Sequence, residues 1–100
     1  MAYIIYKYLV STEKEAKKIS FKFLQELELD NVLTLGFPEF ISFCSGWRVP
    51  LKYNYFYAIG QIIVDARKGL IDEKRTTSKD QLEDRISRKL EIKARRKDEC

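Results

Sequence analysis

The segment 50–68 constrains the fold most, because its apolar residues recur with the clearest helical period in the chain. Pro50 suits the first turn of a helix, and Gly69 suits the left-handed residue that follows a last turn. We therefore expect one helix over 50–68. Its main apolar side is formed by Leu51, Tyr55, Ile59, Ile62, Ile63 and Ala66.

A second apolar group falls on nearly the opposite side of this expected helix. It consists of Tyr53, Tyr57 and Val64, with Gly60 between them. A surface helix normally carries one apolar stripe, so two stripes indicate either an enclosed helix or a face that meets a partner. We take Tyr53, Tyr57 and Val64 as the candidate face for a partner or for self-association.

Two further helices are predicted by capping boxes, in which a Ser or Thr is followed three residues later by Glu or Gln. They cover residues 13–28 and 79–96, and their boxes are Thr12 with Glu15 and Ser78 with Gln81. The charged segment 72–77 would link the last helix to the rest of the chain. Along that helix a narrow apolar stripe recurs every four residues, at Leu82, Ile86, Leu90 and Ala94.

The remaining segments are shorter. Tyr3–Val10 and Val32–Leu35 favour strands, which would form a β-α-β unit around the first helix. For 37–51 a short helix ending at Gly46 competes with a hairpin. We favour the helix, because the amide of Pro50 cannot donate to a sheet ladder.

These elements predict a single domain over residues 1–100 with a helix-dominated α+β fold. It has three main helices at 13–28, 50–68 and 79–96, a short helix and a small N-terminal strand region. An all-α fold is the alternative. The expected core consists of Ile5, Ile19, Phe23, Leu27, Leu33, Phe40, Leu51, Tyr55, Ile59, Ile62 and Ala66.

The amino-acid composition excludes several catalytic and metal-binding mechanisms. The chain has no histidine, which excludes Ser-His and Cys-His catalysis and histidine metal sites. It has no glycine-rich phosphate loop, and its two cysteines, Cys44 and Cys100, lack metal-type spacing. We expect no cofactor and no metal. An enzyme that uses carboxylates or lysine stays open, but we expect a protein that binds rather than catalyses.

Positive charge gathers near the C-terminus, where residues 85–97 carry seven cations against one anion, Glu91. The candidate phosphate-binding residues are Arg85, Arg88, Lys89, Lys93 and Arg96. Like charges at i,i+4 repel one another, and nucleic-acid phosphate would offset that cost. The plainer explanation is a solvated helix end whose cations complement the helix dipole.

Aromatic residues concentrate between positions 37 and 57, with Arg48 and Lys52 among them. Such a mixture can stack nucleobases, but it more commonly builds a core, and we expect a core. No segment approaches the roughly 20 apolar residues of a membrane span. With two widely spaced cysteines, this predicts a cytoplasmic protein.

The function predicted from these features is a protein-interaction module. It would act as a self-associating accessory or inhibitory protein, as a homodimer or with a protein partner. The alternative is a nucleic-acid-binding protein that uses the basic C-terminal helix.

Overall fold

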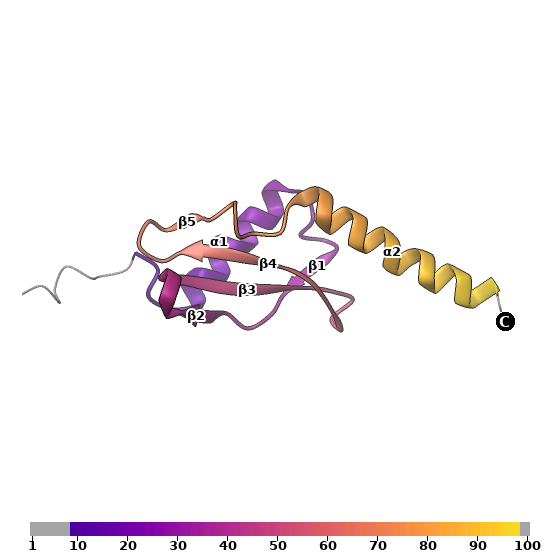
Figure 1. Ribbon diagram of the computed structural model, residues 1–100, viewed down its shortest axis with the longest axis horizontal. Helices are drawn as coiled ribbons and strands as arrows, with labels where there is room; N and C mark the ends of the chain where they lie inside the picture. Colours follow the sequence, from indigo (N-terminus) through magenta and orange to yellow (C-terminus); the bar gives the residue numbers. More distant parts are fainter. Residues whose placement is uncertain (1–8, 99–100) are drawn as a thin grey trace, which may run out of the picture.

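A computed structural model describes the backbone of residues 9–98 and the side chains of residues 9–89. Within that range the fold is α+β, with two helices and an antiparallel sheet of five strands (Figure 1). The prediction of a helix-dominated fold with three main helices is therefore wrong, and so is the all-α alternative. In chain order the elements are α1 (Glu13–Glu26), β1 (Leu33–Leu35), β2 (Glu39–Ile41), the 3₁₀ turn η2 (Ser42–Cys44), β3 (Gly46–Tyr53), β4 (Tyr57–Asp65), β5 (Leu70–Ile71) and α2 (Lys79–Asp98).

Strand β3 is the centre of the sheet. Both β1 and β2 pair with it on one side, β4 pairs with it on the other, and β5 lies beyond β4. Helix α1 packs across one face of this sheet, whereas α2 continues past the end of the sheet (Figure 1). The β3–β4 hairpin therefore ends close to where α2 leaves the body of the protein.

The predicted helix over 50–68 is replaced by this β3–β4 hairpin. Asn54 and Tyr55 reverse the chain with φ values of 54° and 64°, which breaks the segment in two. Successive strand residues point to opposite faces, so the buried run Ile62, Ile63 and Val64 occupies both faces of β4. Burial on both faces produces two apolar groups in the sequence, which we had assigned to two sides of a helix.

The short helix predicted within 37–51 is also wrong, because β2, the η2 turn and β3 form a hairpin there. Pro50 is tolerated in β3 because its carbonyl, which accepts from Gly36 N at 2.8 Å, faces the gap between β1 and β2. Nitrogen and carbonyl of one residue point to the same side of an antiparallel strand. The missing amide hydrogen therefore faces a place where the ladder needs no donor.

The helices over 13–28 and 79–96 are confirmed as α1 and α2. The strand predicted over 32–35 is confirmed as β1, which pairs antiparallel with β3. Most of the strand predicted over 3–10 lies outside the described residues, and so does the expected core residue Ile5. Val10, at the edge of that region, is buried, and Trp47 Nε1 donates to its carbonyl at 2.9 Å.

The core lies between α1, the sheet and the first turn of α2. Of the expected core, two aromatic residues are exposed instead, Tyr55 at 72% and Phe40 at 38%. Five expected residues are buried, and three more on α1 or just after it are half-buried against the core. The buried ones are Leu33, Leu51, Ile59, Ile62 and Ala66, and the half-buried ones are Ile19, Phe23 and Leu27.

Candidate functional site

The end of the β3–β4 hairpin carries four aromatic side chains, which we call the aromatic tip: Tyr53, Tyr55, Phe56 and Tyr57. Tyr53 is half-buried against the core and pairs across the strands with Tyr57, which is 44% exposed. Tyr55 and Phe56 lie in the turn and are 72% and 85% exposed. The tip therefore presents three accessible rings on a base that the core holds in place.

The turn holds its backbone in an unfavourable conformation. Asn54 tolerates a positive φ, but Tyr55 is a bulky residue with φ of 64°. Just behind the turn, the register shifts between Leu51 and Lys52, which leaves Ile59 as the extra residue of a β-bulge. Bulges increase strand twist and redirect side chains. This local geometry sets the direction in which the aromatic rings project.

Helix α2 is held beside the tip by the segment that precedes it. The segment 72–77, predicted as the charged linker to the last helix, lies along the outer edge of β4. Thr76 Oγ1 accepts from Ile63 N at 2.9 Å, and Thr77 Oγ1 accepts from Gln61 N at 3.0 Å. The capping box then forms as predicted, since Ser78 Oγ accepts from Gln81 N at 3.2 Å and Gln81 Oε1 accepts from Ser78 N at 3.1 Å.

Three basic side chains of α2 reach toward β4 and the tip. Arg85 Nη1 donates to the carbonyl of Ile59, and Lys89 Nζ lies 4.4 Å from the centre of the Tyr57 ring. Arg88 is more exposed and pairs with Asp84 on the same helix at 3.1 Å. Together with Ala58 and Ile59, the three cations line an open depression between α2 and β4.

A second depression lies on the other flank of the tip. It is lined by Tyr55, by the exposed ring of Phe37 and by the basic side chains of Lys17 and Lys52. Lys17 Nζ lies 5.9 Å from the centre of the Phe37 ring. The aromatic tip is therefore flanked by cations on both sides, supplied by α1 and β3 on one side and by α2 on the other.

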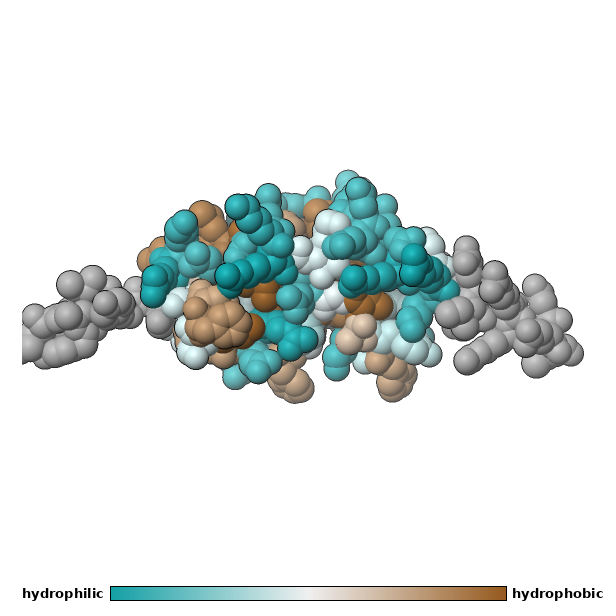
Figure 2. All heavy atoms as spheres, in the orientation of Figure 1, coloured by the Kyte–Doolittle hydropathy of each residue, from teal (hydrophilic) through white to brown (hydrophobic). Residues whose placement is uncertain are grey.

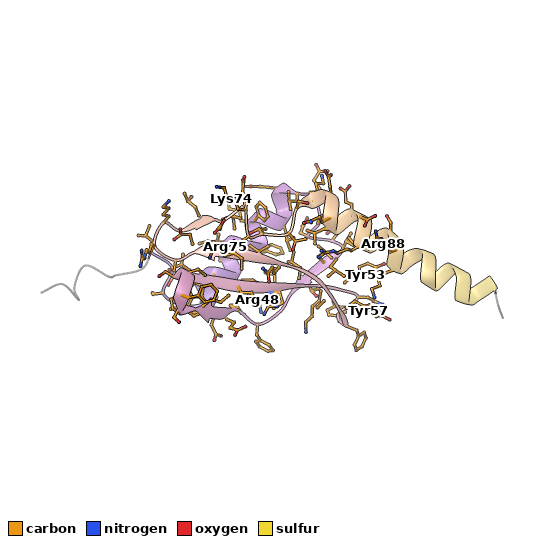
Figure 3. The ribbon with its side chains drawn as sticks, viewed as in Figure 1. Arg48, Tyr53, Tyr57, Lys74, Arg75 and Arg88 are labelled. Carbon is orange, nitrogen blue, oxygen red and sulfur yellow. The ribbon has the colours of Figure 1, made fainter. Side chains whose placement is uncertain are left out.

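The structure brings together residues that the sequence assigned to two different surfaces. Figure 3 shows Tyr53, Tyr57 and Arg88 at the same end of the molecule, beside α2. Val64, the third member of the predicted partner face, is fully buried at the opposite end of β4 and belongs to the core. Of the predicted phosphate-binding residues, Arg85, Arg88 and Lys89 lie beside the tip, whereas Lys93 and Arg96 lie outside the residues whose side chains are described.

The aromatic group expected to build the core is divided between core and surface. Trp47 is buried, while Phe37, Phe43, Tyr55 and Phe56 are exposed. In the space-filling view, apolar side chains project from the hydrophilic surface along its lower edge (Figure 2). The signal that could have located the tip is Asn54, a residue that accepts positive φ, between two runs of β-forming residues.

No family model, curated protein or solved structure matches this chain. Within the described residues, no group of three or more His, Cys, Asp or Glu side chains gathers where it could hold a metal ion. Neither helix in the described part of the chain combines the length and apolar character needed to cross a bilayer. The candidate site is thus defined by its geometry alone, as a surface of exposed aromatic rings and cations.

Proposed function

We propose that this chain is a protein-interaction module that self-associates by antiparallel pairing of α2 with the α2 of a second copy. The observation that carries the proposal is the course of α2. The helix is anchored by Leu82, which is fully buried, and by Ile86, which is half-buried, and it then continues to Asp98 beyond the end of the sheet (Figure 1).

The outer part of α2 is a short helical extension past the end of the sheet. From residue 90 to residue 98, beyond the contact of Lys89 with Tyr57, it makes about two and a half turns, and isolated helices below about 12–15 residues are marginal in water. Helical stability in proteins comes mostly from packing of an apolar face. The stripe that anchors α2 on the sheet continues in the sequence through Leu90 and Ala94, so a partner helix would extend this packing.

The spacing of the stripe suits a second helix better than an extension of the sheet. Residues four apart are rotated by about 40° around a helix axis, so the stripe winds around α2 rather than running straight along it. Rows with this spacing are the ridges that interlock when two helices pack across one another.

The distribution of charge along α2 favours a second α2 helix as the partner, in antiparallel orientation. The first two turns of α2 carry three exposed anions, Asp80, Glu83 and Asp84, whereas residues 85–97 carry seven cations against one anion. A parallel pair would place like charges side by side. An antiparallel pair places the acidic beginning of each helix beside the basic end of the other, which is the two-fold, self-complementary arrangement of most homodimers.

Charge reversal with complementation tests this pairing. Glu83→Lys with Asp84→Lys makes both halves of α2 basic, and Lys93→Glu with Arg96→Glu lowers the positive charge of the outer half. Each double variant alone should sediment as a monomer at concentrations where the parent dimerises. An equimolar mixture of the two should dimerise again. In the mixed pair, the acidic beginning of the second variant meets the basic outer half of the first, and the half made basic in the first variant meets an outer half of lowered positive charge.

The matched control is Lys68→Glu with Lys74→Glu, which reverses two exposed charges away from α2. This variant should dimerise like the parent in sedimentation velocity. A parent that stays monomeric up to millimolar concentration, or a mixture that stays monomeric, refutes the proposal.

A further inference from the structure

We infer that the aromatic tip and the cations on its two flanks form a binding site for single-stranded nucleic acid. This site is separate from the pairing of α2 helices and stands on different residues. It brings together Tyr55, Phe56 and Tyr57 with Lys17, Lys52, Arg85, Arg88 and Lys89.

The exposed rings are the first reason. Phe56 is 85% exposed and Tyr55 is 72% exposed, on two successive residues of one turn. Phe37, beside Tyr55, is 85% exposed as well. Contiguous apolar surface of this kind marks a place where a ligand or partner docks. Flat aromatic rings are the groups on which unpaired bases stack, whatever the base sequence.

The backbone of the turn is the second reason. Glycine would adopt the φ of 64° at position 55 without steric cost, yet the chain has tyrosine there. Strained backbone conformations of this type concentrate at binding sites, because the strain directs a side chain that function requires. Here it projects the Tyr55 ring toward the depression that Lys17 and Lys52 line.

The arrangement of charge is the third reason. Lys89 lies over the Tyr57 ring at 4.4 Å, and Arg88 lines the same depression. On the other flank, Lys17 lies 5.9 Å from the Phe37 ring and Lys52 lies beside it. Each nucleotide of a single strand carries one flat base and one phosphate. Exposed rings with cations beside them therefore match a single strand in both its bases and its phosphates.

Two other anionic partners match less well. A duplex keeps its bases stacked on one another, so it can use the cations but not the rings. An acidic peptide supplies carboxylates without the planar groups that three exposed rings would stack. We therefore expect the protein to prefer single strands over both.

The experiment measures binding of a fluorescently labelled oligothymidylate of about 12 nucleotides by anisotropy, at several salt concentrations. The parent should bind, and log K should fall with log salt by about 0.7 per neutralised phosphate. Tyr55→Ser with Phe56→Ser should weaken binding roughly tenfold or more, since two stacking rings are lost. Lys52→Glu with Arg88→Glu should weaken binding and flatten the salt dependence.

The chain offers a matched control in Phe43, which is 87% exposed in the η2 turn at the other end of β3. Phe43→Ser should bind the oligonucleotide like the parent. The Tyr55→Ser/Phe56→Ser variant should also sediment like the parent, which separates this site from the pairing of α2.

Three results overturn the inference. The first is no binding at low salt. The second is equal binding of an abasic oligonucleotide, duplex DNA or polyglutamate, which would show attraction to anions alone. The third is an equal loss of affinity in Phe43→Ser, which would show a nonspecific effect of exposed rings.

Discussion

Leu82 of α2 packs directly on Gly60 of β4. A Cβ built at position 60 would lie 2.8 Å from Leu82 Cδ2 and 2.8 Å from Thr77 Oγ1. Real Cβ atoms do not approach other heavy atoms this closely, so a side chain at residue 60 would displace the side chains of Leu82 and Thr77 from their present positions. This contact helps to place the first turn of α2 against β4, next to the hydrogen bonds that Thr76 and Thr77 accept from β4.

Gly60→Ala should therefore destabilise the protein by about 1–3 kcal/mol, the usual cost of overpacking a core. Urea denaturation gives the change in the free energy of unfolding, and limited proteolysis within α2 should become faster. The combined cost of Gly60→Ala and Leu82→Ala should be smaller than the sum of the two single costs, because Leu82→Ala removes one of the two close contacts that the new Cβ would make. Additive costs would mean that the two residues do not contact each other.

Truncation of Ile59 tests the assignment of the buried face. Ile59 is only 4% exposed at the β-bulge and belongs to the core. Ile59→Ala should lower the free energy of unfolding by about 2–5 kcal/mol. Phe43→Ala, which removes a larger but exposed side chain, should change it by less than about 0.5 kcal/mol. An unchanged melting temperature in Ile59→Ala would contradict the core described above.

Thr76 closes the outer edge of β4, and its hydroxyl should be required there. Thr76 Oγ1 accepts from Ile63 N at 2.9 Å and can donate to Ile63 O at 3.4 Å, and the residue is buried. Thr76→Val keeps the shape but leaves a buried amide without its partner, at a cost of about 1–3 kcal/mol. Thr76→Ser, which keeps the hydroxyl, should cost less. Hydrogen exchange at the Ile63 amide should accelerate in Thr76→Val only.

Tyr55 should lower the stability of the protein while contributing to the binding of oligothymidylate. Tyr55→Gly relieves the positive φ within the three-residue turn 54–56, because glycine adopts this conformation without steric cost. We expect the free energy of unfolding to rise by about 0.5–1 kcal/mol, which thermal denaturation can measure. The same variant should bind oligothymidylate more weakly than the parent. A variant that is less stable than the parent would show that the tyrosine ring supports the turn.

Local sequence patterns were sufficient to predict the helices near the two ends of the described chain. Both capping boxes located the starts of α1 and α2, because a cap depends on side chains within one helical turn. The left-handed residue expected at Gly69 is present with φ of 68°. It closes the turn between β4 and β5, however, and does not end a helix.

The candidate site was only partly predictable. Tyr53, Tyr57, Arg85, Arg88 and Lys89 were each singled out from the sequence, but for two separate surfaces. Their proximity depends on a β3–β4 turn and on the Leu82–Gly60 contact, which joins residues far apart in the sequence. Val64 was assigned to the surface because a helical period was applied to a strand.

The sequence by itself determined which segments form the two flanking helices, and it limited the chemistry by lacking histidine and phosphate-loop glycines. Tertiary structure decided the middle of the chain. Segment 50–68 contains apolar groups that fit a helix as well as a strand buried on both faces, and local periodicity does not separate these two cases. Pairing of β4 with β3 and with the segment 72–77 satisfies its backbone as strand, and that long-range pairing places the aromatic tip at the surface.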